Sequence, residues 1–167
     1  MDNLALGQGG NLALASGALA NGTNAGTIKT TVIIPYIIDG RFYYKAVTDN
    51  IVLAFSGPDV YSQNAIEKNG GFVGGAGGST RLYGLYLDTA GAVSIVPSQI
   101  VDTAKLAAGE VALQYPAPQR GKVCFGMLRI AVTAGTTFVP GTTGLTATGV
   151  TASYINLASV PAEPLLS

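Results

Sequence analysis

The chain has 167 residues, with 9 basic and 9 acidic side chains, no histidine and one cysteine. This length suits a single domain that buries a hydrophobic core without disulfides. The balanced charge, with no cluster of Lys and Arg, argues against nucleic acid as a partner, and the lack of histidine argues against zinc enzymes and histidine-dependent catalytic triads.

Residues 2–27 form a tract of Gly, Ala, Asn and Leu that is almost uncharged. Its glycines disfavour an isolated helix, so we expect an extended or flexible arm that stays disordered or becomes ordered on a partner. The tract has neither the basic start of a signal peptide nor the apolar length of a membrane span, so synthesis in the cytoplasm without a membrane partner is expected. The candidate partner contacts in the arm are Leu4, Leu6, Leu12, Leu14 and Leu19.

Residues 28–55 are rich in β-branched and aromatic side chains and predict a three-stranded meander. Asp39 and Gly40 separate the runs IKTTVIIPYII and RFYYKAV, and this pair favours a type I′ hairpin turn. Pro35 has no N–H to donate, so its strand is expected at a sheet edge or at a bulge. A second turn, VTDN at 47–50, precedes the third predicted strand, IVLAF.

Further along the chain, the runs RLYGLYLD and AVSIV predict a second hairpin. Residues 98–109 leave open a short helix or an irregular crossing, and EVALQY is expected to form a short strand. Both faces of KVCFGMLRIAV are apolar, which predicts a central strand or one covered by a neighbouring subunit. The last predicted strand is GVTASYINL.

Short strands with little helix predict an all-β fold, an antiparallel β-sandwich or barrel-like domain over residues 28–157. Residues 1–27 would form the N-terminal arm, and residues 158–167 a short extended C-terminal tail whose prolines cannot continue a central strand. The candidate partner contacts in this tail are Pro161, Leu165 and Leu166.

No motif in the sequence predicts catalysis, a metal site or a cofactor. The glycine-rich stretch 70–78 lacks the spacing of a phosphate-binding loop. Several acidic residues that could form a catalytic pair lie at predicted turns, where Asp is favoured for backbone reasons. Cys124 has no histidine to act as its base, so we expect a buried, inert thiol and a protein that is not an enzyme.

Tyrosines in the predicted strands allow two interpretations. Aromatic faces stack on carbohydrate, so these side chains could form a glycan-binding platform. Tyrosines on strands more often complete cores or subunit interfaces. The residues concerned are Tyr36, Tyr43, Tyr44, Tyr83 and Tyr86.

Three stretches of the C-terminal half resemble a known group of proteins: LYGLYLDTAGAVSIV, GKVCFGMLRIAV and TFVPGTTGLTATGVTASYINLASVP. They are similar to small structural proteins of tailed bacteriophages, described as head decoration, cement or minor capsid proteins. The resemblance implies a virion protein that binds the outside of the capsid and stabilises it by bridging subunits of the major capsid protein. It also implies a homotrimer, because such proteins often occupy local three-fold positions, while closed symmetry is equally compatible with a dimer.

The composition agrees with a protein whose outer face meets other proteins, because only 11% of its residues are charged and 48% are hydrophobic. Two alternatives remain at this stage. A phage fibre or receptor-binding module that recognises a glycan predicts an exposed cluster of tyrosines. A cell-wall hydrolase predicts a cleft with two apposed carboxylates.

Overall fold

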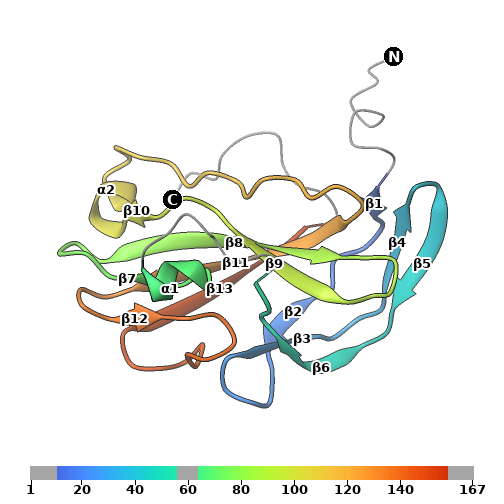
Figure 1. Ribbon diagram of the computed structural model, residues 1–167, viewed down its shortest axis with the longest axis horizontal. Helices are drawn as coiled ribbons and strands as arrows, with labels where there is room; N and C mark the ends of the chain where they lie inside the picture. The colour runs from blue at the N-terminus through green and yellow to red at the C-terminus, as the bar shows by residue number, and fades with distance from the viewer. Residues whose placement is uncertain (1–10, 56–63, 158–167) are drawn as a thin grey trace.

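The computed structural model describes residues 11–55 and 64–157. These residues form an all-β, sandwich-like domain of antiparallel sheets with two short helices (Figure 1). The predicted fold class is therefore confirmed. The predictions for residues 1–10 and for the tail at 158–167 concern residues outside the part of the chain that the structure describes.

The largest layer is a five-stranded sheet with the order β10-β8-β11-β13, in which β9 also pairs with β8. β11 lies between β8 and β13 and pairs with both, so the predicted central position of this strand is confirmed. The bounds are β8 (Ser79–Leu87), β9 (Val93–Pro97), β10 (Val101–Asp102), β11 (Val123–Val132) and β13 (Val150–Asn156).

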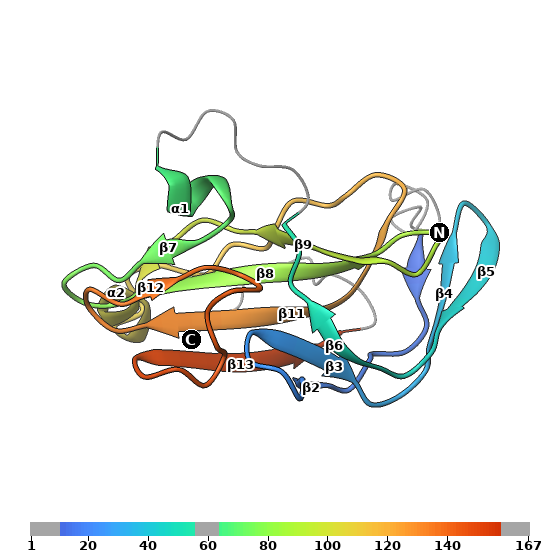
Figure 2. The ribbon, with the colours of Figure 1, turned by 60° about the horizontal axis from the view of Figure 1, so that its bottom comes forward.

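Smaller sheets complete the sandwich (Figure 2). One has the order β2-β3-β6, with β2 (Leu19–Asn21), β3 (Thr27–Thr30) and β6 (Thr48–Val52). Another has the order β1-β4-β5, with β1 (Leu12–Ala13), β4 (Ile34–Ile38) and β5 (Arg41–Lys45). The last pairs β7 (Phe72–Val73) with β12 (Thr137–Phe138). The helices are α1 (Ala65–Lys68) and α2 (Thr103–Ala107), which begin after the capping side chains of Asn64 and Asp102.

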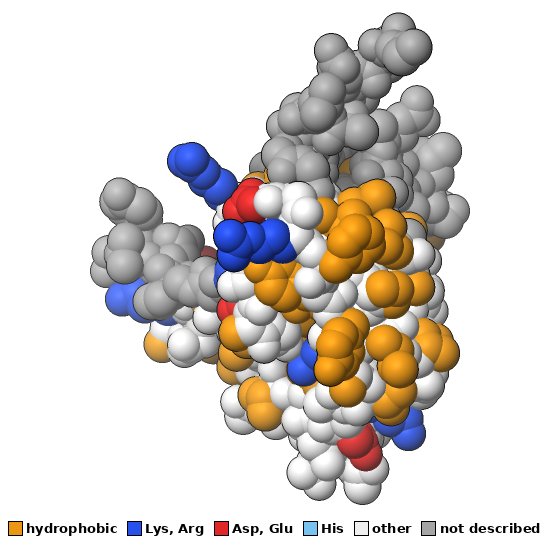
Figure 3. Space-filling view, turned by 90° about the vertical axis from the view of Figure 1, so that its right-hand side faces the viewer, with side chains coloured by type: hydrophobic (Ala, Val, Ile, Leu, Met, Phe, Trp, Pro, Cys, Tyr) orange, Lys and Arg blue, Asp and Glu red, His pale blue; other side chains and the backbone are white. Residues whose placement is uncertain are grey.

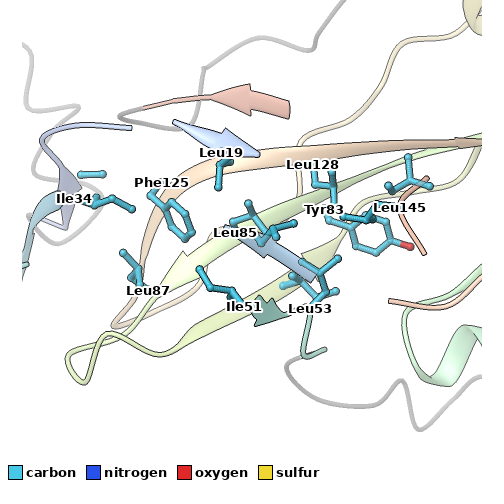
Figure 4. Close-up of a cluster of buried hydrophobic side chains, with 14 of the residues drawn as sticks. Leu19, Ile34, Ile51, Leu53, Tyr83, Leu85, Leu87, Phe125, Leu128 and Leu145 are labelled. Atoms are coloured by element: carbon cyan, nitrogen blue, oxygen red, sulfur yellow. The ribbon is translucent and has the colours of Figure 1, made fainter. Parts of the chain in front are cut away.

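The main core lies between the five-stranded sheet and the smaller sheets. Side chains from both layers meet there, as Figure 4 shows for Leu85 and Phe125 on one side and Leu19, Ile34 and Ile51 on the other. Every one of these side chains is at least nine-tenths buried. Their burial is the principal favourable term for this packing.

A second core covers the opposite face of the five-stranded sheet. Its buried members on the sheet are Leu82, Tyr86, Cys124 and Met127. Leu106 and Leu113, which lie in the segment between β9 and β11, pack onto them. The second apolar face of β11 is thus covered by the same chain.

The predicted meander over residues 28–55 is wrong in its pairing. The run from Ile28 to Ile38 divides into β3 and β4, which belong to different sheets, and β6 pairs with β3 where the meander required β5. The division coincides with a contact to a segment distant in the sequence, because directly after β3 the backbone N–H of Thr31 donates to the carbonyl of Gly17 at 2.9 Å. Likewise, residues 110–115 form no strand in the structure.

Pro35 lies in the middle strand of its sheet, against the expectation of an edge. Its carbonyl accepts a hydrogen bond from the N–H of Leu14 at 2.9 Å. Because proline has no N–H, it cannot return the second bond of this pair. The pairing of β1 with β4 accordingly covers only Leu12 and Ala13, and ends where Pro35 begins.

Residues 11–27, which the sequence places in the arm, are part of the folded domain. Within them, β1 pairs with β4 and β2 pairs with β3. Ala13 and Leu19 are buried in the main core. The physical reason is that these short segments pair as edge strands with β4 and β3 and bury Ala13 and Leu19, although their composition gives no strand signal.

Candidate binding surface

The outward side of the β1-β4-β5 sheet consists only of apolar side chains. Side chains of a strand alternate between the two faces, so every second residue of β4 and β5 points away from the core. The strand register aligns these residues in two rows across the sheet, Leu12, Ile37 and Phe42 in one, and Leu14, Pro35 and Tyr44 in the other. We call these six residues the apolar face.

The apolar face is open to solvent among the described residues. Phe42 is 73% exposed and Tyr44 is 75% exposed. Leu12 and Leu14 are 42% and 46% exposed. Together these four side chains present an apolar area on the order of 500 Å², as large as the largest patch on a typical monomer. Hydrophobic side chains gather over this end of the molecule (Figure 3).

The inner side of the same sheet anchors it to the domain. Ile34, Tyr36 and Ile38 are buried in the main core. The Tyr36 hydroxyl donates a hydrogen bond to the carbonyl of Asp88 at 2.9 Å, and its ring stacks on Tyr43 with a centroid distance of 5.5 Å. Burial, and then the nearby charge of Asp88, raise the pKa of Tyr36 above its ordinary value. The apolar face is therefore held by a packed and hydrogen-bonded layer.

The charged residues of β5 lie at its two ends and belong to the other row of side chains. Arg41 pairs with Ile38, and Lys45 pairs with Ile34, whose side chains point into the core. The six outward residues contain no charge and no hydrogen-bonding group other than the Tyr44 hydroxyl. Such a surface favours contact with another apolar surface over contact with an ion or a charged substrate.

The structure brings only part of the predicted leucine set to this surface. Leu12 and Leu14 belong to the apolar face, whereas Leu19 is only 6% exposed and packs in the core. Its backbone N–H donates to the side-chain oxygen of Asn156 at 2.8 Å. The other candidates lie outside the described residues: Leu4, Leu6, Pro161, Leu165 and Leu166.

The five candidate tyrosines do not form an exposed cluster. Tyr36, Tyr83 and Tyr86 are at most 2% exposed, and burial raises the pKa values of Tyr83 and Tyr86 above the ordinary range. The Tyr83 hydroxyl donates to the carbonyl of Gly70 at 2.7 Å, which is a core contact. Tyr43 is half-buried, and Tyr44 is the exposed member.

Phe42 is the most exposed of the three members of the apolar face that the sequence analysis did not select; the others are Pro35 and Ile37. In the run RFYYK, Phe42 and Tyr44 alternate with Tyr43, so these two share one face of the strand. The two-residue turn at Asp39 and Gly40 fixes this register, and both residues have the positive φ angles of 50° and 76° expected for a type I′ turn. The alternation was a usable signal for a pair of outward aromatic side chains.

Elsewhere in the described residues we find no arrangement typical of a catalytic or metal-binding site. Burial raises the pKa of the Cys124 thiol to about 11, which disfavours the thiolate. Among residues 11–55 and 64–157, no group of three or more Cys, Asp or Glu side chains is placed to hold a metal ion. A shallow hollow of about 390 Å³ near Gly78 and Thr133 is lined by small residues without a carboxylate. No helix in the described part has the length and apolar character needed to cross a membrane.

Comparisons of the chain with models of protein families, with curated proteins and with solved structures found no match.

Proposed function

We propose that this protein is a non-enzymatic structural protein of a phage virion. In this proposal it binds the outside of the capsid, contacts the major capsid protein through its apolar face and stabilises the shell by bridging subunits. It would be made in the host cytoplasm and would reside on the capsid surface. The resemblance of the C-terminal half to phage head proteins supplies the class of partner.

The observation that carries the proposal is the uncovered apolar face. Phe42 and Tyr44 lie side by side on it and are each about three-quarters exposed. Aromatic side chains of this kind are enriched where protein interfaces derive most of their energy. A face without charge also suits a permanent contact, since permanent interfaces are more apolar than transient ones.

The size of the apolar face indicates that binding at two sites on the capsid would be needed for high affinity. The face can bury about 500 Å² on this protein, whereas stable specific interfaces bury about 800 Å² on each partner. A single contact through this face is therefore smaller than a standard interface. Two contacts on one shell would raise the effective affinity by a factor of about 100 to 10,000.

The first test is the amount of this chain in purified virions. Quantitative mass spectrometry would give its molar ratio to the major capsid protein. Icosahedral shells repeat each surface site many times, so a capsid-binding protein is expected at hundreds of copies per particle. A few copies, or none, would contradict the proposal and direct attention to the tail or to a role outside the virion.

The second test addresses the face itself. Purified heads assembled without this chain are mixed with the wild-type protein or with the Phe42→Ser/Tyr44→Ser double variant, and bound protein is measured after sedimentation. We expect the double variant to lose at least about 100-fold in affinity, because two aromatic anchors are removed. Ile100→Ser is the matched control, since Ile100 is an exposed apolar residue, at 41%, outside the apolar face. Equal binding by all three proteins would exclude this face as the capsid contact.

A fibre or receptor-binding module that recognises a glycan is the second candidate. Its support is the same pair of exposed aromatic rings, Phe42 and Tyr44, because neighbouring rings on one face can stack on a sugar. The burial of Tyr36, Tyr83 and Tyr86 removes most of the platform that this function requires. Binding of wild-type protein to an array of host-surface glycans, lost in the double variant, would favour this function over capsid binding.

A further inference from the structure

The strand β13 forms one edge of the five-stranded sheet, and among the described residues only β11 pairs with it. The backbone N–H of Thr133 donates to the carbonyl of Gly149 at 3.0 Å, directly before the strand begins. This bond fixes the alternation of the ladder, so Thr151, Ser153 and Ile155 direct their backbone groups towards β11. The backbone groups of the alternate residues point away from the sheet.

These outward residues are Ala152, Tyr154 and Asn156. No backbone or side-chain group of residues 11–55 or 64–157 is hydrogen-bonded to their N–H or C=O groups. The side chains of Tyr154 and Asn156 do form hydrogen bonds across the sandwich. The Tyr154 hydroxyl donates to the side-chain oxygen of Asn21, and the side-chain oxygen of Asn156 accepts from the N–H of Leu19. The edge therefore presents a row of backbone donors and acceptors on a strand that is firmly held.

The sequence of β13 lacks the usual protection of an exposed edge. Natural edge strands carry charged residues or proline that discourage pairing with another chain. The strand Val150–Asn156 reads VTASYIN and contains neither. It is thus open to pairing with a further strand.

The other long edge, on β5, is protected. Its outward backbone groups belong to Phe42 and Tyr44, because Ile38 and Arg41 close the hairpin turn. A second copy paired antiparallel about Tyr43 would place Arg41 opposite Lys45 of that copy. Like charges directly opposite each other destabilise a strand pair.

β13 is complementary to itself. In an antiparallel pair centred on Ser153, Ala152 of one copy lies opposite Tyr154 of the other, so outward donors meet outward acceptors on both sides. Thr151 lies opposite Ile155 of the second copy, and no charged residues face each other. The nearest charged residue is Arg129 of β11, which pairs with Ser153 of β13. The two Arg129 positions would lie three strand spacings apart, about 14 Å, which exceeds the screening length at physiological salt.

We propose that two copies of this chain pair through β13, antiparallel about Ser153, into a dimer with one continuous sheet. A contact between identical edges closes at two copies, so this arrangement replaces the trimer that the resemblance implies. The inference does not depend on the proposed function. Where that function also holds, the dimer carries two apolar faces and gains the two-site binding described above.

A disulfide between the two copies tests whether their Ser153 positions lie opposite each other. Residues opposite each other at such a position have Cα atoms about 4.5 Å apart, within the range that a disulfide spans. In full-length Ser153→Cys protein, mild oxidation with copper phenanthroline should therefore give a covalent dimer. Cys124, whose side chain is buried, does not compete. Thr137→Cys, an exposed position on β12, is the matched control and should remain monomeric on a denaturing gel.

The mass in solution gives the second arm of the test. Sedimentation of the wild-type protein at about 10–100 μM should give twice the 16.9 kDa mass of the chain. Ser153→Lys should give the monomer mass with an unchanged circular dichroism spectrum, because two ammonium groups would face each other at the axis. Thr137→Lys adds the same charge on β12 and should remain a dimer. Ala152→Pro provides a second disruption, since it removes only an outward N–H.

Three outcomes would overturn the inference: a wild-type monomer, a wild-type trimer, or a dimer that forms no disulfide through Ser153→Cys. A wild-type monomer that also forms no disulfide would show that the β13 edge does not pair between copies. All these measurements use the isolated protein without capsids. Failure here is therefore distinct from failure of the capsid-binding proposal.

Discussion

Cys124 illustrates how burial controls chemistry at a single residue. The residue is 6% exposed and belongs to the second core. Burial raises the pKa of this thiol, and hydrogen bonds with the backbone at Gly126 and Leu85 offset only part of the effect. Because the folded state holds the thiol proton more tightly than the unfolded state, the free energy of unfolding is highest while the thiol is protonated. It falls as the pH rises through about 11.

We expect Cys124 to react very slowly with iodoacetamide in the folded protein. A rise of the pKa from 9.0 to about 11 lowers the thiolate fraction at neutral pH by about 100-fold, and steric exclusion adds to this. The measurement compares the alkylation rate in buffer with the rate in a denaturing concentration of urea. Rates within tenfold of each other would contradict the buried position of the thiol.

The tyrosines mark the limit of sequence reasoning at the residue scale. Tyr43 and Tyr44 are neighbours in one strand and have nearly the same local sequence, yet Tyr43 stacks on Tyr36 and Tyr44 is exposed. Alternation along the strand predicts that they point to opposite faces. Which of the two faces meets the core depends on the sheet that packs against it, and this is set by residues far away in the sequence.

At the scale of elements, the hairpins were predictable because local turn chemistry specifies them. The turn at Asp39 and Gly40 and the turn after Asp88 both join paired strands as expected. In the second turn, the Asp88 carboxylate accepts hydrogen bonds from the N–H groups of Ala90 and Ala92. The assignment of β3 and β4 to different sheets was not predictable, since it depends on contacts with residues 11–21.

The β4–β5 turn provides a prediction at this scale. Gly40 has a φ of 76°, and an added Cβ would meet no atom within 4 Å. Gly40→Ala should therefore lower the stability by about 1 kcal/mol through backbone strain alone. For a domain of this size the expected fall in Tm is about 2–4 °C by calorimetry.

Gly75→Ala is the matched control for the turn variant. Gly75 does not have a positive φ, and its added Cβ would meet only the Ser79 hydroxyl oxygen at 3.8 Å. Its Tm should stay within about 1 °C of the wild-type value. An equal fall in both variants would show that the effect is not due to the left-handed conformation at Gly40.

At the scale of the whole molecule, the two ends of the described chain depend on each other. Ala13 and Leu19 lie in the main core, and β2 supports both β3 and β13. The sequence analysis predicted that residues 1–27 form an arm, because residues 2–27 are rich in Gly and Ala. The role of residues 11–21 follows from pairing with β3 and β4 and from the burial of Ala13 and Leu19, and local composition does not predict such long-range partners.

Truncation tests this dependence. Deletion of residues 2–27 should abolish cooperative thermal unfolding, because it removes β1, β2, the first residue of β3 and the buried side chains of Ala13, Leu19 and Thr27. Deletion of residues 2–10 leaves every described contact in place and should retain a cooperative transition. The measurement is calorimetry of both proteins. A cooperative transition in the longer deletion would show that residues 11–27 are dispensable for the fold.

The contact between β2 and β13 has a consequence for synthesis on the ribosome. Leu19 bonds to Asn156, a residue 137 positions later. The chain emerges with β2 first, so this contact between β2 and β13 cannot form until the residues up to Asn156 have been made. Contacts this distant in sequence also slow folding. During that interval the nascent chain exposes its core strands, and exposed apolar surface of this kind favours binding by chaperones.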